Sequence, residues 1–217
     1  SPMHFAARLA AATPVAGLLA WQGYVWYEAR PKELKKSPQG TLFYIGSLDD
    51  RIMDALDTGD VILFGRKWWM QMPFGALTTF LRRHFGDTEY DHAAVVVMDE
   101  RGKPCVFEFT HSGVKIRPYD ERILRSRAES IIVRRLRAKR TPAMRSKLLT
   151  WARKQEGIKY PFGLDEVVAA TMIDGARCRE NAVRTVAHPA ASLVAQSWKA
   201  MGVLPAHARP AKLLVAK

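Results

Sequence analysis

The stretch from Tyr90 to Val114, YDHAAVVVMDERGKPCVFEFTHSGV, decides the fold of this chain. Its segment Ala93–Val97 is apolar on both faces of a pleated strand, which is typical of a strand that is covered on both sides. A glycine and a proline within Asp99–Pro104 are turn residues, and apolar residues resume over Cys105–Thr110. The stretch therefore predicts a β-hairpin whose two strands lie in the core of a domain.

Two titratable side chains lie on these predicted strands. His92 opens the first strand, and Glu108 stands in the second strand between Phe107 and Phe109. Alternation along a strand places the carboxylate on the face opposite the two phenyl rings. A lone histidine at a strand start is most often structural, but a buried carboxylate needs a partner or its pKa rises. We therefore expect Glu108 to orient His92.

The order of several motifs resembles the circularly permuted papain-like cysteine amidases and hydrolases, relatives of the NlpC-type peptidases and of lecithin retinol acyltransferase. The resemblance spans Gly59 to Val203. It implies an α+β fold in which an antiparallel sheet packs against helices, and an apolar helix precedes this domain in the present chain. The residues that carry the resemblance are Gly59–Leu63, Tyr90–Val97, Val106–Glu108, Gly113 with Val114, Arg117–Tyr119, and Leu193–Ala195 in a helix that ends at Met201 and Gly202.

The resemblance implies a role for three positions. The strand histidine of the family is the general base, here His92, and a polar residue on the next strand orients it, here Glu108. The family's nucleophile is a cysteine three residues before the Leu-Val pair of the C-terminal helix, and that position is Ala190 in this sequence. A thiol there would be activated by the helix dipole and the imidazole, which a methyl group cannot replace. We therefore expect a vestigial triad.

No other residue matches the missing nucleophile. Ser192 is two positions further along the predicted helix and is rotated by about 200° from Ala190. Cys178 lies in a charged, glycine-containing segment outside the family's motifs, and Cys105 lies three residues before Glu108. Because the only two cysteines lie far apart in the sequence, neither a disulfide framework nor a zinc site is predicted. No other metal and no cofactor are expected.

The N-terminal region is expected to be separate from this domain. Residues 9–27 carry no charge and include four aromatic side chains at one end. As a helix they would span about 28 Å, close to a bilayer core of about 30 Å, so a transmembrane helix and a helix packed on a partner protein are both open. A signal peptide fits poorly. We divide the chain into an apolar helix (1–29), a basic linker with a short amphipathic helix (30–58), the papain-like domain (59–205) and a basic tail (206–217).

The remaining elements follow from periodicity and end signals. A strand is predicted at Val61–Phe64 and another at Ile131–Leu136. The sequence Thr141-Pro142 predicts the start of a helix that ends at Gly157. Its inner residues would be Met144, Leu148, Trp151, Ala152 and Gln155, and the last helix would bury Leu193, Val194, Ser197, Trp198 and Met201. Further helices are expected at Ser47–Leu56, with Leu48, Ile52 and Leu56 on one face, and at Phe74–Phe85.

The charge of the chain predicts an acidic partner. Thirty-four Lys and Arg residues against 21 Asp and Glu give a net charge of +13. Five of the basic side chains fall in one short run, and we expect them to contact lipid headgroups, such as those of cardiolipin, or acidic neighbouring subunits. RNA is the less favoured partner, because the run contains no aromatic residue for base stacking. The five residues are Arg134, Arg135, Arg137, Lys139 and Arg140.

Two functions from different classes remain open at this point. The favoured one is a pseudoenzyme: an accessory subunit of a membrane-associated assembly, placed in the mitochondrial inner membrane in a respiratory complex or ATP synthase. The other is a thiol hydrolase or acyltransferase on amides or esters, in which Ala190 replaces a native cysteine. Ala191 and Ser192 favour the pseudoenzyme, since the resemblance implies Ser and Glu at these positions. A single engineered change would have left those two residues intact.

A cluster of aromatic and methionine side chains follows the strand predicted at Val61–Phe64. It is either a core contact or a lipid-binding lip. Its members are Trp68, Trp69, Met70, Met72 and Phe74.

Overall fold

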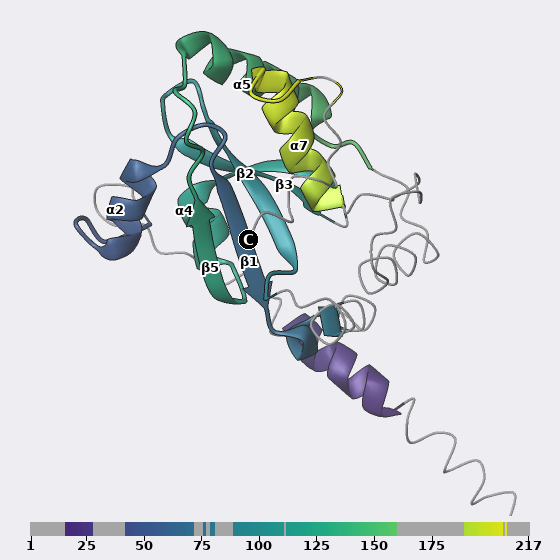
Figure 1. Cartoon of the computed structure of the whole chain (residues 1–217). Coiled ribbons are helices and arrows are strands. Elements are labelled where there is room, and N and C mark those ends of the chain that lie inside the picture. Colours follow the sequence, from purple (N-terminus) through teal and green to yellow (C-terminus); the bar gives the residue numbers. More distant parts are fainter. Residues whose placement is uncertain are drawn as a thin grey trace, which may run out of the picture.

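The computed structural model describes residues 16–27, 42–71, 76, 79–80, 89–110, 112–159, 189–205 and 207. These residues form a mixed helix and sheet structure, in which helices cover both faces of a five-stranded sheet (Figure 1). The expected α+β class with an antiparallel sheet is therefore confirmed. Of the expected helix at Phe74–Phe85, only residues 76, 79 and 80 are described, and they are helical. The segment with Cys178 and most of the C-terminal tail lie outside the described residues.

The sheet has the strand order β4-β3-β2-β1-β5, and all neighbouring strands are antiparallel. The predicted hairpin is confirmed as β2 and β3, with Val95 opposite Phe107. Asp99 closes its turn, because its Oδ1 atom accepts hydrogen bonds from the backbone N–H groups of Arg101 and Lys103 at 2.8 and 2.7 Å. The strands are β1 (Val61–Arg66), β2 (His92–Met98), β3 (Pro104–Thr110), β4 (Gly113–Pro118) and β5 (Ala128–Arg134).

Alternation along the strands divides the core into two clusters. On one face Val95, Val97 and Phe107 pack with residues of α5 (Pro142–Gln155) and α7 (Pro189–Met201). On the other face Val96 and Phe64 pack with residues of α2 (Leu48–Ala55) and α4 (Tyr119–Leu124). We call these the α5/α7 face and the α2/α4 face. All five residues of Ala93–Val97 are buried, as expected for a strand that is covered on both sides.

The helices α5 and α7 lie together above the sheet (Figure 1). Helix α5 begins as predicted, because the Thr141 side chain accepts a hydrogen bond from the backbone N–H of Met144 and Pro142 occupies the first turn. Its Leu148 and Ala152 are fully buried, so the predicted inner face is confirmed. In α7 the residues Leu193, Val194, Ser197 and Met201 are buried, again as predicted, whereas Trp198 is only partly buried.

A close approach at Gly59 sets the position of α7 against the sheet. Gly59 has a φ of +89°, and a Cβ atom there would lie 2.9 Å from side-chain atoms of both Leu136 and Met201. The indole Nε1 of Trp198 donates to the Gly59 carbonyl oxygen at 2.9 Å. Glycine is therefore needed both for the left-handed backbone and for the space that α7 occupies.

Some elements differ from the sequence predictions. The last strand is Ala128–Arg134 rather than Ile131–Leu136, because it pairs with β1 from Ala128 onward, across a bulge at Gly65 and Arg66. Strand β4 and helix α4 had not been predicted. Helix α2 begins after the cap residue Ser47, but its Leu48 is 72% exposed, so only part of the expected apolar face packs on the sheet. A short 3-10 helix, η1 (Trp68–Met70), follows β1.

Candidate functional site

The hairpin brings His92 and Glu108 together. Glu108 lies opposite Ala94 in the β2–β3 register, so His92 is its diagonal neighbour on the same face. The Nε2 atom of His92 and the Oε2 atom of Glu108 are 2.8 Å apart. Their side chains are 11% and 1% exposed. Glu108 thus has His92 as a hydrogen-bond partner, as we expected for a buried carboxylate.

Two arginines complete the surroundings of the carboxylate. Arg122, from α4, contacts Glu108 through its Nε at 2.5 Å and through a terminal nitrogen at 3.0 Å. Its guanidinium also lies 4.4 Å from the centre of the Phe64 ring. A terminal nitrogen of Arg117, from β4, donates to Oε1 of Glu108 as well. The sequence analysis does not identify either arginine as a site residue. A carboxylate within an apolar strand does indicate that cationic side chains from other elements are needed to compensate its charge.

These contacts set the charge states of the pair. Burial would raise the pKa of Glu108, but the hydrogen bonds from His92 and Arg122 outweigh burial and hold that pKa well below its ordinary value. Burial lowers the pKa of His92, and the nearby Glu108 carboxylate only partly offsets this. At neutral pH the arrangement is thus a neutral imidazole beside an ionised carboxylate, which forms ion pairs with both arginines.

The pair is chemically arranged as a proton acceptor. An ionised carboxylate only accepts hydrogen bonds, so the Nε2 of His92 must carry the hydrogen that it donates to Glu108. The Nδ1 atom then has a free lone pair, which is the state that a general base requires. The Phe64 ring lies 5.7 Å from the imidazole, centre to centre, and packs against it. His92 and Glu108 are thus in the mutual contact that the family resemblance implied, and their catalytic roles stay a prediction.

The expected nucleophile position lies in different surroundings. Ala190 is the second residue of α7 and is 2% exposed. It belongs to the apolar cluster on the α5/α7 face, together with Ala93 and Val95. His92 and Glu108 share the other strand face, with Ala94. Helix α7 packs on β2, so neighbouring elements carry the base and the nucleophile position, but their side chains point into different clusters. The assignment of Ala190 to the triad stays a prediction.

Within the described part of the chain, neither Cys105 nor Ser192 is placed to act as a nucleophile at this pair. Cys105 is half-buried on β3, where burial and then the charges of Asp99 and Asp120 raise the pKa of its thiol to about 11. By strand alternation it is on the face opposite Glu108. The Ser192 hydroxyl accepts a hydrogen bond from Gln196 of its own helix at 3.1 Å. Cys178 lies outside the described residues.

The basic run after β5 is divided between the surface and the interior. Arg134, Arg135, Arg137 and Lys139 are exposed. Arg140 has a side chain that is only 10% exposed; it donates to the Thr58 carbonyl oxygen at 2.8 Å and pairs with the fully buried Asp60. Arg140 thus stabilises the start of β1 from within the fold. The four other residues remain the proposed lipid-binding or acidic-partner surface.

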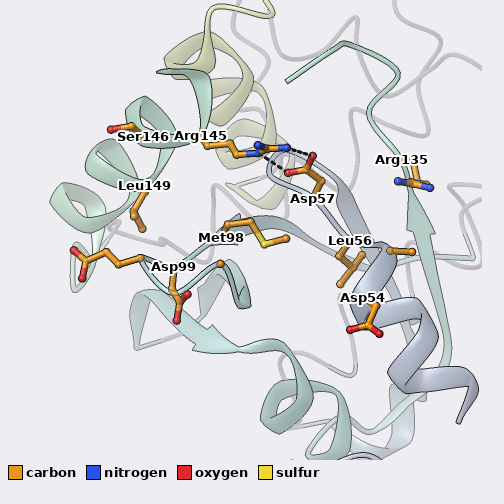
Figure 2. Close-up of a pocket in the computed structure, with 12 residues that line it drawn as sticks. Asp54, Leu56, Asp57, Met98, Asp99, Arg135, Arg145, Ser146 and Leu149 are labelled. Carbon is orange, nitrogen blue, oxygen red and sulfur yellow. Dashed lines mark hydrogen bonds and ion pairs between the residues drawn. The ribbon is translucent and has the colours of Figure 1, made fainter. Parts of the chain in front are cut away.

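A cavity of about 780 Å³ lies away from the His92 pair, between α2, the β2–β3 turn and α5. Figure 2 shows Arg145 of α5 reaching across it to Asp57, with hydrogen bonds of 2.9 and 2.7 Å. Arg135 and Asp54 line it as well (Figure 2). None of His92, Glu108 and Ala190 lines this cavity, so it is separate from the candidate site.

The described residues contain neither a cluster of metal-binding side chains nor a membrane-spanning helix. No group of three or more His, Cys, Asp or Glu side chains in this part of the chain is arranged to hold a metal ion. Within the same residues, none of the helices combines the length and the apolar character that crossing a bilayer requires. The expected apolar segment is represented there by a helix over residues 16–27, and its earlier residues lie outside the described part.

Comparisons with known proteins identify a family for this chain but no relative of curated function. A solved crystal structure, that of metalloprotein yiiX from Escherichia coli O157:H7 (DUF1105), is similar to this chain, with 24% sequence identity and a TM-score of 0.39. The similarity covers 57% of this chain and 68% of that chain. Among proteins with curated functions, none matches this sequence. The family model described as "Permuted papain-like amidase enzyme, YaeF/YiiX, C92 family" matches residues 56–168.

This match includes His92 and Glu108 and ends before Ala190. It confirms the permuted papain-like resemblance from the sequence. Because the matched residues are more than half of the 217, this chain belongs to the YaeF/YiiX family of permuted papain-like amidases.

Proposed function

We propose that this chain is a catalytically inactive member of its family, which acts as an accessory subunit of a larger membrane-associated assembly. The observation that carries the proposal is Ala190, a 2% exposed methyl group at the position where the family resemblance implies a cysteine. A methyl group can neither form a covalent intermediate nor give up a proton. The cluster around Ala190 is apolar, so this helix start is packed as part of the core.

The retained His92–Glu108 pair is compatible with this proposal. Glu108 is held by His92 and by two arginines from different elements, so the network connects β2, β3, β4 and α4. Such a network has a structural role that persists when catalysis is lost. Removing one partner would leave a buried charge without compensation. Retention of the pair is therefore expected in an inactive family member.

The assembly part of the proposal rests on charge. A net charge of +13 and the exposed Arg134, Arg135, Arg137 and Lys139 favour acidic partners, either anionic lipid such as cardiolipin or acidic protein subunits. The mitochondrial inner membrane, with a respiratory complex or ATP synthase, is the proposed location. Purification of the full chain from its native membranes in mild detergent tests this: the chain should co-migrate with a large complex, and recovery as a free monomer would contradict it.

One observation favours an alternative function. The imidazole of His92 is held neutral, with Nδ1 as the available base, which is the state that a thiol hydrolase or acyltransferase would need. In that alternative, the chain acts on amides or esters and Ala190 replaces a native cysteine. Sequencing the transcript at codon 190 separates the two: an alanine codon supports the inactive subunit, and a cysteine codon supports the enzyme.

A further inference from the structure

An uncharged helix lies exposed on the described structure. Residues 16–27, AGLLAWQGYVWY, contain no charged side chain, yet Val25 is the one residue among them that is buried. Leu18 and Leu19 are 51% and 66% exposed, and Tyr24 is 48% exposed. Exposed apolar side chains that gather on one helix are normally covered by protein or by lipid. Something outside the described fold is therefore needed to cover it.

This helix joins a second exposed apolar segment. The indole Nε1 of Trp21 donates to the backbone carbonyl of Trp69 at 2.7 Å, which connects the helix to η1. Trp68 and Trp69 of η1 are 39% and 42% exposed. In Figure 1 the helix, in purple, lies beside the segment that follows β1, at the end of the molecule away from α5. We call Leu18, Leu19, Tyr24, Trp68 and Trp69 the aromatic surface.

Two cationic side chains contact this helix and η1. Lys67 lies over the Trp69 ring, with its Nζ 5.7 Å from the ring centre. A guanidinium nitrogen of Arg127 donates to the Val25 carbonyl oxygen at 3.3 Å. Neither residues 16–27 nor residues 66–71 contain Asp or Glu. Exposed indole and phenol rings with cations next to them match the level of phospholipid headgroups, where aromatic rings bridge apolar chains and water and cations meet anionic phosphate.

From this combination we propose that the aromatic surface docks on an anionic lipid bilayer, with Trp68, Trp69 and Tyr24 at headgroup level and Lys67 facing lipid phosphates. The proposal deepens the proposed function, since it rests on the membrane association assumed there and assigns it to particular residues. It is independent of whether the papain-like domain is active.

The test uses the full chain in flotation with two kinds of vesicle, phosphatidylcholine alone and phosphatidylcholine mixed with phosphatidylglycerol. The probe variant is Leu19→Glu and the matched control is Ile45→Glu, because these side chains are 66% and 68% exposed and Ile45 lies outside the aromatic surface. Circular dichroism checks that both variants fold. A third variant, Lys67→Gln, tests the charge.

We expect the natural chain and Ile45→Glu to float with the mixed vesicles. Leu19→Glu should bind about tenfold more weakly, because a carboxylate replaces an apolar side chain against anionic headgroups. Lys67→Gln should lose part of the preference for the mixed vesicles. Quenching of tryptophan fluorescence by brominated lipid should accompany binding, since four of the six tryptophans lie in or beside the surface.

Two results would overturn the proposal. If Leu19→Glu floats as well as Ile45→Glu, lipid does not bind at this surface. If the natural chain binds neither kind of vesicle but still co-migrates with a large complex, a protein partner covers the surface. In that case the accessory role would stand without lipid docking. A cysteine codon at position 190 would remove the inactive-subunit proposal without affecting the flotation result, so the two failures are distinguishable.

Discussion

The buried carboxylate Glu108 offers the sharpest test of how the site is held together. The change Glu108→Gln keeps the size of the side chain but removes its charge. Glu108 is 1% exposed, while the side chains of Arg122 and Arg117 are 12% and 36% exposed. Arg122 would therefore lose most of its charge compensation within the protein, and Arg117 would be partly compensated by water.

The expected loss of stability follows from these exposures. Removing one partner of a fully buried ion pair costs about 3–5 kcal/mol, and the partial exposure of Arg117 places Glu108→Gln near the lower end, at about 3 kcal/mol. For a chain of this size that corresponds to a melting temperature lower by about 6–12 °C. Urea unfolding followed by tryptophan fluorescence measures it, and the slope against urea should not change.

A matched control and a pH series complete this test. Glu129 is exposed on β5, and Glu129→Gln should change the free energy of unfolding by less than about 0.5 kcal/mol. Because the folded-state pKa of Glu108 is depressed, its contribution is present above the unfolded pKa of about 4.3 and is lost as the pH falls through the folded pKa. The difference between the natural chain and Glu108→Gln should thus narrow below about pH 4. A loss under about 1 kcal/mol at pH 7 would refute the account of the network.

Three further changes test other parts of the structure. Burial lowers the folded-state pKa of His92, so the natural chain should lose stability as the pH falls below about 6.5. His92→Gln should reduce that loss, and an equal loss in both chains would contradict a neutral buried imidazole. Asp60→Asn should cost about 3 kcal/mol in urea unfolding, since Asp60 is fully buried against Arg140; a neutral result would contradict the role given to that arginine. Thr141→Ala should cost about 1 kcal/mol through loss of the α5 cap, and an unchanged melting temperature would argue against the cap.

Local sequence signals were sufficient to predict the elements that have both a clear periodicity and clear end signals. The valine run with its glycine and proline turn predicted the hairpin, and Thr141-Pro142 with Gly157 predicted both ends of α5. The spacing of Leu193, Val194, Ser197 and Met201 predicted the buried side of α7. In each case the periodicity and the end signals agree, so tertiary contacts reinforce what the local sequence favours.

The partners of Glu108 depended on tertiary structure. The sequence showed that a buried carboxylate needs compensation, but Arg117 lies on β4 and Arg122 on a helix of six residues, neither of which has a strong periodic signal. In the basic run, too, the sequence alone did not show which side chain is buried. Its residues look alike in the sequence, yet Arg140 turns inward because Asp60 is buried behind it at the start of β1. Which member of a charged run is buried depends on the strands that meet there.

The central claim is that this chain carries a papain-like fold without its chemistry. Hydrolysis of an activated ester and of an amide by the natural chain tests it most directly, with His92→Gln and Ala190→Cys measured beside it. The account predicts no hydrolysis by the natural chain above the buffer rate, and no difference between it and His92→Gln. Turnover by the natural chain that disappears in His92→Gln, and is raised further in Ala190→Cys, would contradict the claim.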